Sequence, residues 1–185
     1  MPIIFRPVWL LPLVLFSCTD PQPGVDASAE PPLIGAAEAG NITVLAQLLD
    51  DQSPVDVRDV CQWTPLMKAA LNGHLEAARR LIEAGAAVDL TDKGGYSAMM
   101  LAASNNHSEL VQLLLEHGAK VDQVEQTGGW TALIWAAKQG HLETVRVLLA
   151  HQADRTLTDQ QGRRAIDWAQ AGGHQAVSAL LAVAE

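Results

Sequence analysis

The side chains in this sequence best suited to metal binding or acid–base chemistry are its six histidines. They stand at two recurring positions, one occupied by His74, His107, His141 and His174 and the other by His117 and His151. An imidazole can ligate a metal ion or carry a proton, but a metal centre needs several such groups to converge on one point. Side chains that recur at a fixed step along a stacked fold project in parallel instead. We therefore predict structural roles for the histidines, with no metal site and no cofactor.

The sequence holds no other motif for catalysis. His74-Leu75-Glu76 and His141-Leu142-Glu143 lack the cysteine pair of a zinc deaminase and the second histidine of a zinc protease. A Gly-x-Ser-x-Gly nucleophile turn and a Gly-x-x-x-x-Gly-Lys phosphate loop are both absent from the sequence. We predict that the protein is not an enzyme, and an enzyme remains only a remote alternative.

The composition indicates a folded helical protein. Of its 185 residues, 49% are apolar and 4% are aromatic, which is too hydrophobic for a disordered chain. A core with so few rings favours helices packed closely through small side chains over a β-sandwich. The formal net charge of −9 argues against nucleic acid as a partner, because phosphate binding needs a basic face.

The N-terminal segment carries the features of an export signal. Residues 1–17 combine one basic side chain, Arg6, with an apolar run that ends at Phe16, as in a secretory signal peptide. Leu15-Phe16-Ser17-Cys18 also resembles the lipobox of bacterial lipoproteins, in which the cysteine becomes the lipidated first residue of the mature protein. Phe16 departs from that pattern, because a small or β-branched residue is usual there.

We expect from this segment an exported bacterial protein that is periplasmic and tethered to a membrane by a lipid on Cys18. Conventional cleavage without a lipid and an uncleaved anchor are the alternatives. Residues 18–30 are rich in proline and acidic side chains and are predicted to form a flexible tether.

From residue 31 onward the sequence repeats itself in three ways. The first marker reads TPLMKAA at 64–70, SAMMLAA at 97–103, TALIWAA at 131–137 and RAIDWA at 164–169, at steps of 33, 34 and 33 residues. The second is Gly-His or Asn-His at 73–74, 106–107, 140–141 and 173–174, and the third is EAGA, EHGA and AHQA at 83–86, 116–119 and 150–153. These markers share one register, and together they resemble the ankyrin repeat, whose unit is a β-turn followed by two antiparallel helices.

The resemblance implies an all-α solenoid over residues 31–185. We expect about five stacked units, at approximately 31–58, 59–91, 92–125, 126–158 and 159–185, with divergent end units. The residues support this layout locally. Thr64, Ser97 and Thr131 are helix-capping types, and Gly85 and Gly118 fall where a left-handed helix end is expected. One extra residue is expected to enlarge the turn near Glu125.

The resemblance also implies a partner-binding surface on the hairpin tips and the exposed side of each unit's first helix. The residue before each capping position is aromatic or arginine, and these residues are Trp63, Tyr96, Trp130 and Arg163. Such side chains commonly anchor interfaces, although each can also pack within its own repeat. Neighbouring candidates are Arg58, Lys93, Leu71, Asn72, Ser104, Asn105, Lys138 and Gln139. Trp135 and Trp168, inside the first helices, are expected to belong to the core.

Cysteine usage leaves two alternatives open. The chain has two cysteines, Cys18 and Cys61. A lipid on Cys18 excludes a bond between them, whereas an unmodified Cys18 can form a disulfide with Cys61. Cys61 is otherwise interpreted as an incidental surface residue at a hairpin tip.

The sequence thus predicts a monomeric module that binds another protein in the bacterial cell envelope, and contacts the membrane only through the N-terminal lipid. Two functions compete. The protein is either a scaffold or accessory factor for an envelope protein, or an inhibitor or immunity protein that masks a toxin or an enzyme.

Overall fold

The computed structural model describes residues 31–182. Within this range the chain forms ten short α-helices: α1 (Pro32–Glu38), α2 (Ile42–Asp50), α3 (Pro65–Asn72), α4 (Leu75–Glu83), α5 (Ala98–Ser104), α6 (Ser108–Glu116), α7 (Ala132–Gln139), α8 (Leu142–Ala150), α9 (Ala165–Ala171) and α10 (Gln175–Ala182). No helix in the described part is long and apolar enough to cross a bilayer.

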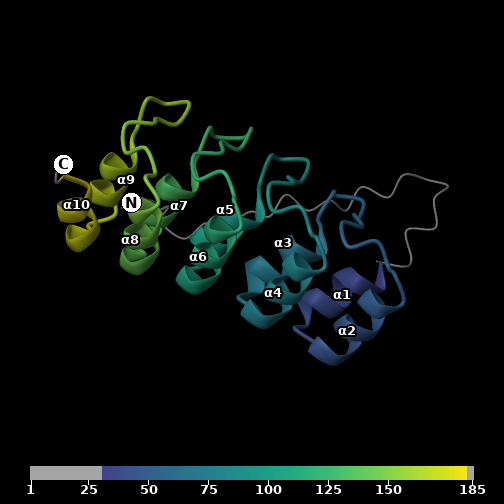
Figure 1. Ribbon diagram of the computed structural model, residues 1–185. Coiled ribbons are helices and arrows are strands. Elements are labelled where there is room, and N and C mark those ends of the chain that lie inside the picture. The colour runs from purple at the N-terminus through teal and green to yellow at the C-terminus, as the bar shows by residue number, and fades with distance from the viewer. Residues whose placement is uncertain (1–30, 183–185) are drawn as a thin grey trace, which may run out of the picture.

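The helices form five antiparallel pairs that stand side by side in one row (Figure 1). The first helices of successive pairs contact one another and form an inner layer, α1, α3, α5, α7 and α9. The second helices form an outer layer in the same order. Long loops precede α3, α5, α7 and α9 and project to the same side of the row. This is the all-α solenoid that the sequence predicted.

The three middle inner helices, α3, α5 and α7, each begin at a hydroxyl cap. The side-chain oxygens of Thr64, Ser97 and Thr131 accept hydrogen bonds from the backbone N–H three residues on. These bonds satisfy amides that a helix start otherwise leaves without a partner. The last inner helix lacks a capping hydroxyl, and there the order is reversed, because Asp167 Oδ2 accepts the backbone N–H of Arg164 at 2.8 Å.

Small side chains allow the inner helices to pack closely. The alanine pairs of the first marker are fully buried, namely Ala69, Ala70, Ala102, Ala103, Ala136 and Ala137. The outer helices contribute larger side chains at one repeat position, where Leu81, Leu114, Leu148 and Leu181 are all buried in the same core. The core therefore runs the length of the row, which accounts for a composition rich in apolar residues and poor in rings.

Three aspartates in the connecting loops accept hydrogen bonds from the backbone of the next unit. The carboxylate of Asp56 accepts the backbone N–H of Ala87 at 3.1 Å, and Asp89 accepts that of Lys120 at 2.9 Å. Asp122 repeats the contact with Asp154 at 2.9 Å. Because each bond links neighbouring units, no unit is stabilised alone.

Candidate functional site

The four hairpin tips share one design. A carboxylate at the start of each tip, from Asp59, Asp92, Glu125 or Asp159, accepts backbone N–H groups of the turn that follows it. Asp59, for example, accepts from Cys61 and Trp63, both at 2.8 Å. The residue before each helix cap is therefore held by its own backbone at a fixed place above the inner helices.

The third tip differs as its extra residue predicted. Glu125 replaces aspartate there, and its longer side chain reaches the N–H groups of Thr127, Gly128 and Trp130. The carboxyl is buried, with the whole residue 2% exposed. The enlarged turn thus retains the same backbone arrangement at Trp130.

Backbone hydrogen bonds also join each tip to the next. Lys93 N–H donates to Cys61 O at 3.2 Å, Gln126 N–H to Gly94 O at 2.9 Å, and Gln160 N–H to Gly128 O at 2.9 Å. The tips consequently form a continuous ribbon, and their outward side chains keep a regular spacing.

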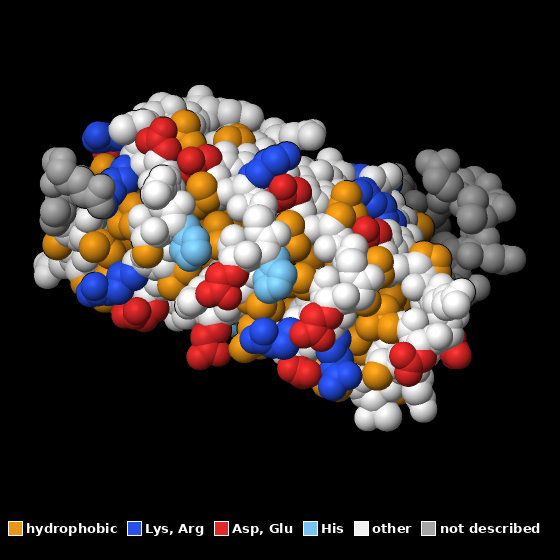
Figure 2. All heavy atoms as spheres, in the orientation of Figure 1, with side chains coloured by type: hydrophobic (Ala, Val, Ile, Leu, Met, Phe, Trp, Pro, Cys, Tyr) orange, Lys and Arg blue, Asp and Glu red, His pale blue; other side chains and the backbone are white. Residues whose placement is uncertain are grey.

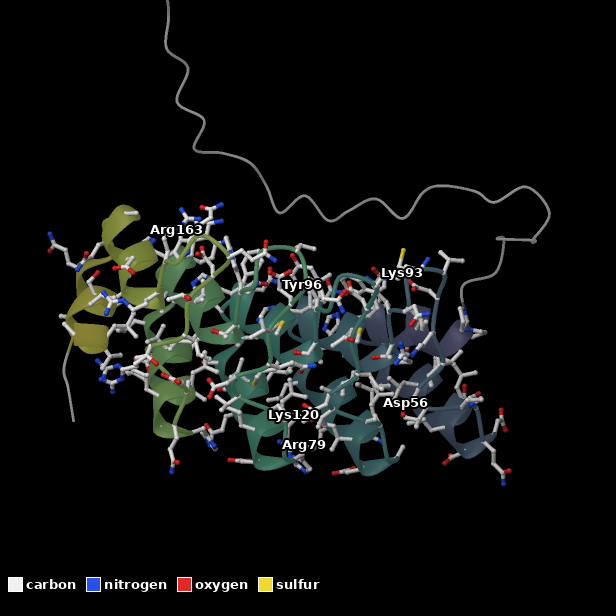
Figure 3. All side chains as sticks on the ribbon, turned by 90° about the horizontal axis from the view of Figure 1, so that it is seen from above. Asp56, Arg79, Lys93, Tyr96, Lys120 and Arg163 are labelled. Atoms are coloured by element: carbon white, nitrogen blue, oxygen red, sulfur yellow. The ribbon has the colours of Figure 1, made fainter. Side chains whose placement is uncertain are left out.

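The predicted column of Trp63, Tyr96, Trp130 and Arg163 lies along one side of the row, and all four side chains are half-buried. Figure 3 shows Tyr96 and Arg163 on the same edge of the molecule as Lys93, whereas Arg79 lies towards the opposite edge. The Tyr96 hydroxyl lies 3.0 Å from Thr127 Oγ1 on the next hairpin. Burial, followed by the nearby charges of Glu125 and Asp92, raises the pKa of Tyr96 above its usual value despite that bond.

Three tryptophans of this face form one cluster. The Trp130 ring lies between those of Trp135 and Trp168, with centroid distances of 4.5 and 4.9 Å. Tyr96 extends the group, 6.1 Å from Trp135. Tilted ring pairs at these distances attract one another beyond the area they bury. Trp135 and Trp168 are half-buried rather than enclosed, so the expectation that they belong to the core holds only in part.

Two cations cover the tryptophan cluster. The Lys138 ammonium lies 4.2 Å from the Trp130 centroid, 4.9 Å from that of Trp168 and 5.6 Å from that of Trp135. The Arg163 guanidinium stacks 3.6 Å above Trp168. Burial among the rings, and secondly the charge of Arg163, lower the pKa of Lys138 from its usual value. We call these five residues the Trp–Lys cluster.

The other sequence candidates divide by exposure. Lys93, Asn72, Asn105 and Gln139 are exposed. Leu71 is half-buried and packs against the core. Arg58 is half-buried and joins two hairpins, because its Nη1 donates to Gln62 Oε1 at 2.8 Å and to Thr91 O at 3.2 Å. Ser104 is buried, 7% exposed, and its hydroxyl donates to Leu101 O. Because Ser104 is buried, the prediction that it contacts a partner is withdrawn.

The histidines of the first set hold adjacent units together. In each case the ring Nε2 lies 3.0 to 3.1 Å from a backbone carbonyl at the end of the inner helix of the preceding unit, and these histidines are His74, His107, His141 and His174. A carbonyl only accepts, so each ring carries its proton on Nε2. Burial, more than the charges of His174 and His107, lowers the pKa of His141, which favours its neutral form. Residues 31–182 contain no group of three potential ligands close enough to hold a metal ion.

The repeated unit thus consists of a hairpin held by a carboxylate, a capped inner helix, a histidine that bonds to the preceding unit, and an outer helix. A family model for ankyrin repeats, three copies long, matches residues 33–125 and again residues 121–185. The chain belongs to the ankyrin repeat family. No curated protein is significantly similar to it in sequence. Ankyrin repeats are generic protein–protein interaction modules, and their fold is a non-enzymatic scaffold.

Sequence reasoning placed Trp130, Lys138 and Arg163 on this ankyrin face but left out Trp135 and Trp168. The signal for both was present in the spacing. They share one repeat position, 33 residues apart, and Trp135 stands one helical turn before Lys138. Both therefore project on the side where the candidates were sought.

Cys61 lies half-buried at the first described hairpin tip of the ankyrin domain and is disulfide-bonded. It is therefore not the incidental surface thiol that the sequence suggested. The predicted signal peptide, the tether and Cys18 lie outside the described residues.

Proposed function

We propose that this ankyrin-repeat protein is a scaffold or accessory factor in the bacterial cell envelope that binds another protein through its hairpin tips and inner-helix face. The observation that carries the proposal is the Trp–Lys cluster, which places three half-buried indoles and two cations together on that face. Tryptophan and arginine are the residues most often found as interface anchors.

Exposed apolar side chains on the hairpins support the same surface. Val60 is 64% exposed and Val124 is 49% exposed, and each is adjacent in sequence to a tip carboxylate. The face over the outer helices instead intermixes acidic, basic and apolar side chains (Figure 2). A partner that buries apolar area would gain more on the hairpin side.

The binding test is capture of partners from an envelope extract with the exported protein. Replacing Trp63, Tyr96 and Trp130 together by alanine is expected to abolish capture of the specific partner. These rings also contribute to packing, so a second variant changes only exposed residues, Asn72→Arg, Asn105→Arg and Gln139→Arg. The added bulk should block the face without loss of fold, as checked by circular dichroism. Gln112→Arg on the outer helix α6 is the matched control. Equal capture by the second variant and the wild type contradicts the proposal.

The envelope location is tested separately. The chain has two cysteines, so a lipid on Cys18 and a disulfide at Cys61 exclude each other in one molecule, and the same test decides between them. A Cys18→Ser variant that loses incorporation of labelled fatty acid and moves from the membrane fraction to the soluble periplasm supports the lipid. Wild-type protein recovered in the soluble fraction with a free amino terminus would rule out lipidation.

An inhibitor or immunity protein is the alternative to a scaffold. Both would use the same face, and the activity of the captured partner separates them. A scaffold leaves the partner active, whereas an inhibitor abolishes its activity in the complex.

A further inference from the structure

We infer that the inner face over the last three repeats binds a carboxylate-bearing segment of the partner protein, seated between Lys138 and Arg163. This inference rests on the proposed function and names the chemistry of the partner that the site fits.

The first support is that Lys138 makes no ion pair with any residue in 31–182. The equivalent repeat position in the first unit is Glu38, whose carboxylate pairs with Lys68 of the next unit at 3.1 Å. In the last two units, the residues at these two repeat positions are Lys138 and Trp168, and the Lys138 ammonium lies 4.9 Å from the Trp168 centroid. At the first two units the inner face therefore carries an ion pair. At the last two units it carries an ammonium that contacts aromatic rings and makes no ion pair.

The second support is the geometry of Arg163. Its Nε and Nη2 both lie 3.2 Å from Asp159 Oδ2, and its plane rests on Trp168. The side chain is nevertheless 37% exposed. Because the guanidinium has five N–H donors in a fixed fork, it retains donors for an acceptor arriving from solvent. Stacking and pairing fix its orientation in advance, which reduces the entropy lost on binding.

The charges on this face exclude the other partner chemistries. A lysine or arginine of the partner would meet the Lys138 ammonium, which makes no ion pair in the described part of the chain, and Lys138 already covers the indole faces that could hold it. A nucleic acid needs an extended basic face, and the formal net charge of −9 argues against that class of partner. A single carboxylate can pair with the Lys138 ammonium and accept from the remaining N–H donors of Arg163, and the half-buried rings can contact an adjacent apolar side chain. The predicted recognition element is thus a glutamate or aspartate next to an apolar residue.

The test uses blocked ten-residue peptides with Glu-Leu-Glu, Gln-Leu-Gln or Lys-Leu-Lys at the centre of an otherwise identical sequence. Binding to the exported protein is followed by tryptophan fluorescence, because three of the five tryptophans lie in the cluster. The Glu peptide is expected to bind about tenfold more tightly than the Gln peptide, as for a hydrogen bond to a charged group. Lys138→Met and Arg163→Gln should each remove that preference. Arg79→Gln, on the opposite edge (Figure 3), should not.

Three results would overturn the inference: equal affinity for the Glu and Gln peptides, no binding of the Glu peptide at millimolar concentration, or tighter binding of inorganic phosphate or of a thymidine decanucleotide. The unfolding midpoint of each variant is measured first, and a lowered midpoint for Arg163→Gln leaves Lys138→Met to decide. The two proposals fail in different ways. If the arginine additions block partner capture but Lys138→Met does not, the carboxylate inference is wrong and the binding face stands. If the Glu peptide binds but capture survives the arginine additions, the proposed function is wrong.

Discussion

The indole Nε1 of Trp168 donates a 3.0 Å hydrogen bond to Oδ2 of Asp159. This bond joins the inner helix α9 to the hairpin tip of its own repeat. The same carboxylate accepts the backbone N–H groups of Gln161 and Arg163, both at 2.9 Å. One buried aspartate, its side chain 1% exposed, thus positions the hairpin, the arginine and the ring on which that arginine stacks.

Replacing Asp159 by asparagine should therefore destabilise the protein by about 1–3 kcal/mol at pH 7, because the amide nitrogen cannot accept from Trp168 or Arg163. Burial acts to raise the pKa of Asp159, but the backbone donors of Arg163 and Gln161, with the Trp168 indole, outweigh it and hold the pKa below its usual value.

The sign of the pH dependence of this effect follows from the lowered pKa. The stabilising contribution is present above about pH 4, the range in which an unfolded aspartate titrates, and is lost as the pH falls through the folded-state pKa. Urea unfolding from pH 7 to pH 3 measures it, with the exposed Asp51→Asn as control. A wild-type advantage that grows towards low pH would contradict the assignment.

Lys138 should give a pH dependence of the same sign as Asp159, but at alkaline pH. Its folded-state pKa is lowered by burial and then by Arg163, so between that pKa and about 10.5 the unfolded chain binds more protons than the folded one. The stability of the wild type relative to Lys138→Met should accordingly rise with pH in that window. Urea unfolding of both proteins at several values above pH 7 measures the difference, in which the titration of Tyr96 cancels. A constant or falling difference would show that the ammonium is not desolvated by the rings.

The histidine ties predict a strong dependence on one glycine. Gly73 has a φ of 73°, and a Cβ there would lie 2.5 Å from the His107 ring. Gly73→Ala should therefore cost more than Gly85→Ala, where φ is 93° but no atom lies within 4 Å. The control isolates the backbone cost, about 1–2 kcal/mol. In the double variant Gly73→Ala with His107→Ala, the excess cost should disappear. Purely additive effects in this cycle would show that the contact is not the cause.

Gln152 offers a stabilising substitution. It stands at the repeat position of Gly85 and Gly118 and has a φ of 64°, a left-handed conformation that favours glycine. Gln152→Gly should raise the free energy of unfolding by roughly 0.5–1 kcal/mol, because glycine adopts this backbone without steric cost. Gln152→Ala keeps the steric cost and serves as control. An equal gain from both substitutions would point to the glutamine side chain instead of the backbone.

The repeating sequence determined the fold almost completely. A period of 33 to 34 residues places capping residues, alanine pairs and glycines at equivalent points, and local preferences at Thr64, Ser97 and Gly85 agree with the packed structure. Nearest-neighbour stacking needs little further information, because each unit contacts only the units beside it.

Only the tertiary structure decided which side chains meet on the proposed binding face. The sequence located Trp130 and Lys138 by repeat position, but Trp168 lies in another unit, and the centroid distance of 4.9 Å between the two rings depends on how far one repeat is rotated and shifted against the next. Spacing along the chain does not specify that offset, which results from the packing of small side chains between layers. Ser104 and Lys138 occupy equivalent repeat positions, yet Ser104 is buried and Lys138 lies over three rings. The repeat pattern alone does not distinguish them.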